Sequence, residues 1–222
     1  VEDAVKVFNH GGYAAAADLL DGVIKNTEKP EVKRELATLK ALIDAYAAWD
    51  RFDHKTAKAK FTEALKNQND LRAVFTGAGS MINRIESHVR CVAHLADSKD
   101  PTMAWVQDLL NNAHRRASEH RYDDAVARLY RAIEALAQIR LREQHEISDT
   151  KSVPLDRLPA ALRQEWTSRA RNGFVMLGLR DAYRLLKELG DELGHLFADA
   201  DLDNDERPLL VARNASILAH GF

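Results

Sequence analysis

The clearest structural signal in this chain lies between residues 122 and 145, which read YDDAVARLYRAIEALAQIRLREQH. Apolar side chains recur there every three or four residues, which is typical of an α-helix with one buried face. The expected buried stripe consists of Val126, Leu129, Tyr130, Ile133, Leu136 and Ala137. Arg128, Arg131 and Arg142 fall elsewhere on the helix surface. We therefore predict one long amphipathic helix over 122–146.

The same period continues on both sides of this helix. It predicts further helices near 2–10, 13–26, 31–50, 54–68, 70–97, 101–120, 159–172, 178–190 and 206–220. Breaks rich in Gly, Pro or Asp separate them, including 190–194 and 199–205. Since no segment shows the sustained alternation of a strand, the predicted fold class is all-α.

A weak repeat runs through the chain, and its first two copies lie in the first half. Each copy has a small residue, then an apolar residue four positions later and another three positions after that. The copies begin at Ala16, Ala57 and Ala125. The pattern resembles the second helix of tetratricopeptide repeats. Its spacing is irregular, so independent helical hairpins explain it equally well. We expect residues 1–105 to form an α-helical extension of TPR-like hairpins.

Composition limits the function classes. The chain has 222 residues and is 45% hydrophobic, which is ample for a core. It has no long apolar run and no signal pattern, and Cys91 is its single cysteine, so we predict a cytoplasmic protein without a membrane partner. The 32 basic and 34 acidic residues exclude a protein that coats nucleic acid, but not an enzyme that touches a few nucleotides.

The type of basic residue differs between the two halves. Residues 1–110 contain 10 Lys and 5 Arg, whereas 111–222 contain 15 Arg and 2 Lys. Arginine is the side chain best suited to bidentate phosphate contact. A phosphate-binding site is therefore expected in the second half.

The last ten residues, 213–222, read RNASILAHGF and carry an arginine, an amide and a histidine with little else that is polar. Arg213 and His220 are seven residues apart, close to two helical turns, so both side chains are expected on one helix face. Gly221 is a typical residue just past a helix end, which places His220 in the last turn. There the helix dipole favours the protonated imidazole, by up to about 2 kcal/mol in partly buried cases.

This combination suits cleavage of RNA without a metal ion. The reaction needs a base for the 2′-hydroxyl, an acid for the 5′-oxygen and positive charge beside the phosphorane. His220 can carry a proton, Arg213 matches phosphate oxygens, and Asn214 can add a hydrogen bond. One histidine does not easily serve as both acid and base, whereas a two-fold homodimer brings two together. We predict a composite catalytic site of these residues at a dimer interface.

A second interpretation stays open. Arginine and histidine at this spacing occur by chance on many helices, so 213–222 is also compatible with a capped terminal helix. The chain would then be a non-catalytic α-helical module for interaction or dimerisation. We predict no cofactor and no metal site. His88, Cys91 and His94 have a metal-like spacing, but they fan across a helix and lack a fourth ligand.

Four residues outside 213–222 are further candidates, each with an ordinary alternative. Glu134 is a possible buried acid that orients Arg213 or His220, and otherwise an exposed glutamate near Arg131. Arg115 and Arg116 are candidates for RNA phosphate contact, or for a solvated helix face. Tyr130 is a candidate for base stacking, although aromatic residues at helical spacing are usually core residues.

The spacing of Arg213, Asn214 and His220 is similar to the signature of HEPN-domain ribonucleases. Other segments resemble the C-terminal half of CRISPR-associated proteins that join a CARF domain to a HEPN domain, the ancillary effectors of type III systems. They are Asn111 to Leu141, Leu158-Pro159, Leu177 to Leu179, Tyr183, Leu185-Leu186 and Ser216 to Gly221.

This resemblance implies a HEPN-like bundle of four or five helices over 106–222. It also implies a metal-independent endoribonuclease that cleaves single-stranded RNA as part of CRISPR antiviral defence. In that family cyclic oligoadenylate acts through the CARF domain. This chain shows no Gly-rich turn from strand to helix, so we expect that sensor domain to be absent from it.

Overall fold

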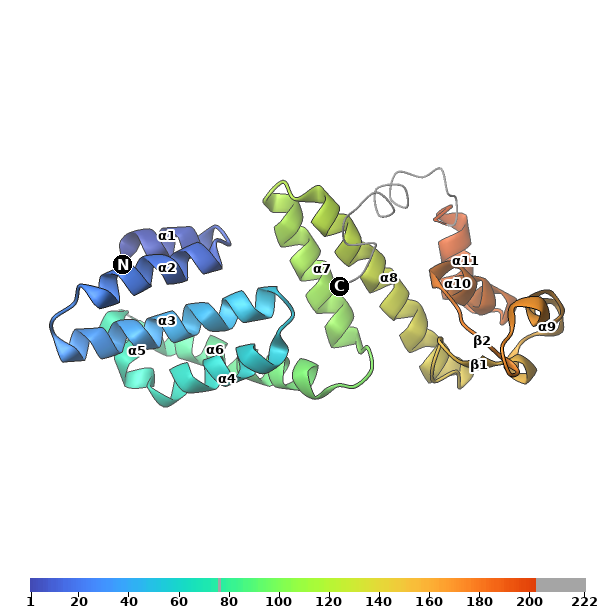
Figure 1. Cartoon of the computed structure of the whole chain (residues 1–222), viewed down its shortest axis with the longest axis horizontal. Coiled ribbons are helices and arrows are strands. Elements are labelled where there is room, and N and C mark those ends of the chain that lie inside the picture. The colour runs from blue at the N-terminus through green and yellow to red at the C-terminus, as the bar shows by residue number, and fades with distance from the viewer. Residues whose placement is uncertain (76, 203–222) are drawn as a thin grey trace. The chain divides into compact units, whose positions relative to one another are not determined.

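The computed structural model describes residues 1–75 and 77–202 (Figure 1). These residues fold mainly into helices, with one two-stranded sheet of two-residue strands, which confirms the all-α class. The chain divides into two units, Val1–Lys99 and a second unit that begins at Asp100. The sequence placed the boundary between 105 and 106. Within the described residues, none of the helices is both long and apolar enough to cross a membrane.

The first unit is a set of helices arranged around α3. Its helices are α1 (Glu2–Asn9), α2 (Tyr13–Lys25), α3 (Pro30–Asp50), α4 (His54–Lys66), α5 (Gln68–Val74) and α6 (Ala78–Asp97). α3 packs against α2, α4 and α5, and α6 packs against α4. Ala45, Ala57 and Ala64 are fully buried between them, because small side chains allow close helix packing. Phe61 and Leu71 fill the same core.

The sequence predicted a single helix over 70–97, and the structure corrects this to two helices. The chain leaves α5 at Phe75, which has extended backbone angles, and enters α6 after Gly77. Gly77 has a φ of 75°, a left-handed conformation that glycine adopts without a steric penalty. The apolar period continues across this break, so periodicity alone does not reveal it.

The second unit begins with the helical hairpin of α7 (Met103–Ser118) and α8 (Tyr122–His145). α8 agrees closely with the predicted helix. α10 (Leu179–Glu188) packs against α8, and α11 (Glu192–Asp199) packs against α10. Tyr183 of α10 stacks on Phe197 of α11, with ring centroids 3.9 Å apart. The Tyr183 hydroxyl also donates a hydrogen bond of 2.9 Å to the backbone oxygen of Ile133, so one side chain connects three helices. Burial raises the pKa of this phenol.

Between α8 and α10 the chain forms a small structure that the sequence did not predict. It contains β1 (Val153–Pro154), a 3-10 turn (Leu155–Arg157), α9 (Ala160–Trp166), a second 3-10 turn (Thr167–Arg169) and β2 (Phe174–Val175). The predicted helix over 159–172 is thus limited to its first half. Val153 pairs with Val175 in an antiparallel ladder. Asn172 and Gly173, both with positive φ, form the tight turn before β2.

A further correction concerns residues 190–194, which the sequence predicts as a break. α11 begins there: Gly190 has a φ of 75°, and Asp191 is the N-cap of α11. Gly194 lies inside the helix, where a Cβ atom would be 2.2 Å from the backbone nitrogen of Lys187. Gly194 is therefore required for the close approach of α11 to α10, rather than for a turn.

Candidate active site

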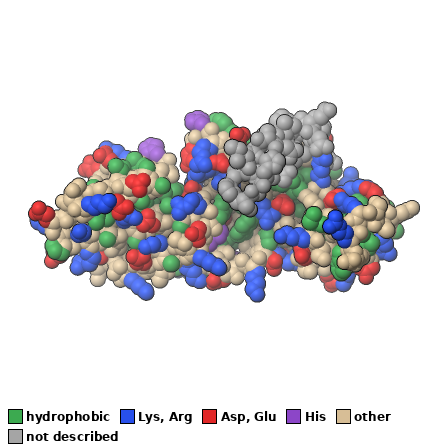
Figure 2. Space-filling model, in the orientation of Figure 1, with side chains coloured by type: hydrophobic (Ala, Val, Ile, Leu, Met, Phe, Trp, Pro, Cys, Tyr) green, Lys and Arg blue, Asp and Glu red, His purple; other side chains and the backbone are tan. Residues whose placement is uncertain are grey.

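Arg213, Asn214 and His220, the predicted catalytic residues, lie outside the described residues. The four other candidate residues all lie on α7 and α8 of the second unit. Figure 2 shows basic and acidic side chains interspersed on the face it presents, as their near-equal totals of 32 and 34 suggest. Among the described residues, no single-sign patch therefore marks a site on this face.

Glu134 forms a local ion pair on α8. Its Oε2 atom accepts a hydrogen bond of 2.6 Å from Nη1 of Arg131, and both side chains are about one third exposed, at 29% and 39%. The Arg131 guanidinium also lies over the ring of Trp105 on α7, 5.4 Å from its centroid. This is the pair with Arg131 that the ordinary interpretation expected. A role of Glu134 toward Arg213 or His220 stays a prediction.

The two adjacent arginines of α7 differ in exposure. Arg116 is buried, with 6% of its surface accessible, and its Nη2 atom pairs with Oε1 of Glu119 at 3.1 Å. Arg116 therefore does not lie on a solvated face, and in this structure it is not presented to an RNA phosphate. Arg115 is half-buried and reaches the surface. It is the better candidate of the two for contact with RNA.

Tyr130 is partly buried and packs against the core of the second unit. That core includes Leu141, Leu162, Leu185 and Leu186. The contact matches the expectation for an aromatic residue at helical spacing. Base stacking by Tyr130 stays a prediction that its packing does not favour.

Sequence reasoning missed a polar row between α7 and α8. Asp108, Asn112 and Arg116 follow one another at four-residue spacing, and all three are buried. Arg128 of α8 donates a hydrogen bond from Nε to Oδ1 of Asn112 and another from Nη1 to the backbone oxygen of Asp124. The sequence pattern predicts Arg128 on the helix surface, and the structure corrects this. A buried polar row of this kind fixes the register of two helices, because shifting one would leave polar groups unpaired.

A second polar cluster joins the end of α8 to the start of α11. Asp191, whose side chain is 3% exposed, accepts hydrogen bonds at Oδ2 from Nε of Arg140 at 2.7 Å and from Nε2 of His145 at 2.8 Å. Its Oδ1 atom accepts from the backbone nitrogen of Leu193 at 2.9 Å. Burial disfavours the charged carboxylate, but the bonds from His145 and Arg140 outweigh it and lower the pKa of Asp191.

This histidine–aspartate pair has a positioning role. Both carboxylate oxygens of Asp191 already accept hydrogen bonds: Oδ2 connects α8 to the start of α11, and Oδ1 caps α11. The sequence signal was the Gly190-Asp191 step, which is typical of a turn followed by an N-cap. Within residues 1–75 and 77–202, no group of three or more His, Cys, Asp or Glu side chains is placed to hold a metal ion.

Two protein-family models match this chain. A model described as the Csm6 HEPN domain matches residues 95–222, and one described as the Csm6 6H domain matches residues 1–90. The first match covers more than half of the sequence. The chain belongs to the Csm6 HEPN family. No curated protein and no solved structure matched it.

Membership of the Csm6 family confirms the resemblance to CRISPR-associated HEPN proteins, and it indicates a ribonuclease. The Csm6 HEPN match extends to residue 222 and so includes Arg213, Asn214 and His220. The helices α7, α8, α10 and α11 also lie within this match. The Csm6 6H match contains all of α1 to α5 and most of α6.

Proposed function

We propose that this chain is a metal-independent endoribonuclease that cleaves single-stranded RNA in CRISPR antiviral defence. The observation that carries the proposal is the Csm6 HEPN match, whose range contains the Arg213, Asn214 and His220 pattern. Neither matched range is described as a CARF domain, so control by cyclic oligoadenylate would require such a domain in addition.

The proposed reaction uses two histidines from the two chains of a homodimer. One His220 accepts the proton of the 2′-hydroxyl, and the 2′-oxygen attacks the adjacent phosphorus. The other His220 gives a proton to the departing 5′-oxygen. Arg213 balances the charge that develops on the phosphorane, and Asn214 donates a hydrogen bond to it. The products are a 2′,3′-cyclic phosphate and a 5′-hydroxyl.

The described helices of the second unit are suited to support such a site. Arg115 on α7 is the residue that we propose for contact with an RNA phosphate, because its side chain reaches the surface and that of Arg116 does not. The polar row between α7 and α8 and the Asp191 cluster hold the helices in fixed positions. A catalytic constellation needs such rigid support to stay in its productive geometry.

The proposal predicts that single-stranded RNA is cut in the presence of EDTA. Cleavage should persist under chelation, and the new ends should be 2′,3′-cyclic phosphates, which mass spectrometry of the fragments detects. A DNA oligonucleotide of the same sequence is the matched control, because it lacks the attacking 2′-hydroxyl and should stay intact. Cleavage that requires added Mg²⁺, or that also cuts the DNA, would contradict the proposed chemistry.

The composite site predicts a second result, obtained by mixing two chains. When wild-type protein is allowed to exchange with an equal amount of the His220→Ala variant, about half of the wild-type chains enter mixed dimers. If one site needs both histidines, cleavage should fall to about half of that of wild-type protein alone. Unchanged cleavage, with exchange shown by native mass spectrometry, would mean that each chain acts alone.

A further inference from the structure

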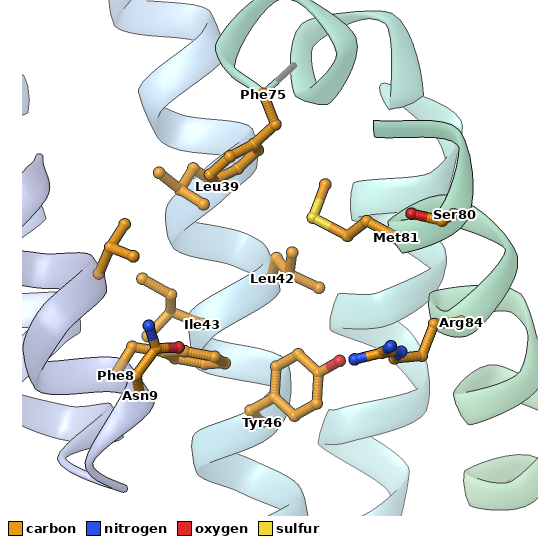
Figure 3. A pocket seen from close by; sticks show the side chains of 11 residues that line it. Phe8, Asn9, Leu39, Leu42, Ile43, Tyr46, Phe75, Ser80, Met81 and Arg84 are labelled. Carbon is orange, nitrogen blue, oxygen red and sulfur yellow. The ribbon is translucent and has the colours of Figure 1, made fainter. Parts of the chain in front are cut away.

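The first unit contains a cavity of about 300 Å³ that the proposed ribonuclease reaction does not use. α1, α3 and α6 contribute most of its lining residues, with Phe75 from the segment after α5 (Figure 3). Its walls are apolar and include Phe8, Leu39, Ile43 and Met81. A cavity of this size is at the lower end of the range for small-molecule sites.

The aromatic side of the cavity is held rigidly by Tyr46. Its ring meets those of Phe8 and Phe61 edge to face, with centroids 5.2 Å and 4.9 Å apart. Its hydroxyl forms a hydrogen bond of 2.9 Å with Nδ1 of His88. Burial raises the pKa of Tyr46 to about 12, so the hydroxyl stays neutral at physiological pH. The cavity thus has a fixed aromatic wall without a negative charge.

The rim of the cavity carries a cation. Figure 3 shows the Arg84 guanidinium of α6 directed toward the Tyr46 hydroxyl, with Asn9 of α1 on the opposite side of the Tyr46 ring. Among the residues that the structure describes, no carboxylate pairs with Arg84, and no Asp or Glu lines the cavity. The positive field of Arg84 contributes to the lowered pKa of His88, after the larger effect of burial. An apolar interior beside an uncompensated guanidinium is complementary to an apolar anion.

We propose that this pocket binds a small aromatic molecule that carries one carboxylate, sulfonate or phosphate group. The aromatic part would occupy the space between Phe8, Phe75 and Met81, and the anionic group would bind Arg84. Aromatic side chains favour a ring over an alkyl chain, because rings gain from edge-to-face contacts. The flexible thioether of Met81 can adapt to the ring. Arginine suits the anionic group because its planar fork matches two oxygens.

Two fluorescent probes of nearly equal shape test this proposal. 1-Anilinonaphthalene-8-sulfonate carries the anionic group, and N-phenyl-1-naphthylamine is the same aromatic framework without it. Arg84→Gln should weaken binding of the sulfonate by roughly tenfold, since a hydrogen bond to a charged group is lost. Binding of the neutral probe should not change. Arg90→Gln, on the same helix and also exposed, is the matched control and should leave both affinities unchanged.

A second variant locates the binding site. Met81→Trp fills the cavity and should abolish binding of both probes, with circular dichroism used to confirm that the helices are intact. Because Arg84 is exposed, its variant tests the proposal even if the Met81 variant does not fold. Equal sulfonate affinities in the Arg84 and Arg90 variants would overturn the role of Arg84. Probe binding that survives in a folded Met81→Trp protein would overturn the pocket as the site.

Discussion

Replacing His220 with alanine is expected to lower the rate of RNA cleavage by a factor of about 10²–10⁴. In the proposed reaction His220 is the only side chain that carries a proton near neutral pH, once as base and once as acid. Its loss therefore slows both formation of the bond from the 2′-oxygen to phosphorus and cleavage of the bond from phosphorus to the 5′-oxygen. Single-turnover cleavage of a labelled RNA in EDTA measures the effect on the chemical step.

The matched control is His195→Ala. His195 lies on α11 of the second unit, and its side chain is exposed, so its loss should leave the rate of cleavage unchanged. Equal thermal unfolding of the two variants would show that His220→Ala acts on chemistry rather than on folding. If His220→Ala kept the wild-type rate, the catalytic role of 213–222 would be wrong. The non-catalytic interpretation of these residues would then hold.

The sequence predicted the fold well where a helix is long and has one apolar face. The range expected for the helix over 122–146 agrees with α8, Tyr122–His145, because 24 residues of periodic pattern leave little ambiguity. The two-residue strands β1 and β2 are too short to show alternation. Their one available signal was Asn172-Gly173, a typical two-residue hairpin turn.

Burial of polar residues was harder to predict than helix positions. Arg116 and Arg128 were expected on solvated surface, but they belong to polar contacts of α7 and α8. A charged residue on the edge of an apolar stripe gives the same sequence pattern whether its side chain is exposed to solvent or buried in a polar contact. For Arg128 the difference depends on Asn112 of α7, which only helix packing brings close. Arg116 pairs with Glu119, three residues further along, and the packing of α7 buries it. The catalytic residues stay predictions from sequence, because 213–222 lies outside the described residues.

Replacing Asp191 with alanine is expected to lower the free energy of unfolding of the second unit by about 2–4 kcal/mol. The change removes the N-cap of α11, which is worth about 1 kcal/mol. It also removes hydrogen bonds to two basic groups, and such bonds contribute about 1.5–3 kcal/mol. The loss should stay below the maximum for a broken buried pair, because Arg140 is 43% exposed and water can solvate it.

Urea unfolding of the full chain, together with hydrogen exchange of the α11 amides, measures this effect. Asp191→Asn is the matched control: it keeps an oxygen for the Leu193 nitrogen, but it replaces the charged oxygen that accepts from Arg140 and His145 with an amide nitrogen. It should therefore lose less stability than the alanine variant. Exchange in α11 that is equally slow in all three proteins would show that Asp191 does not hold this helix.

The contribution of Asp191 should also depend on pH. Its pKa is lowered in the folded protein from the usual 3.8, so the folded state stabilises the charged form. The stabilisation is present above the unfolded value and is lost as the pH falls through the lower folded value. The difference between wild type and Asp191→Asn should therefore be full at about pH 7 and shrink below about pH 4. A difference that grew on acidification would have the wrong sign for a carboxylate held by His145 and Arg140.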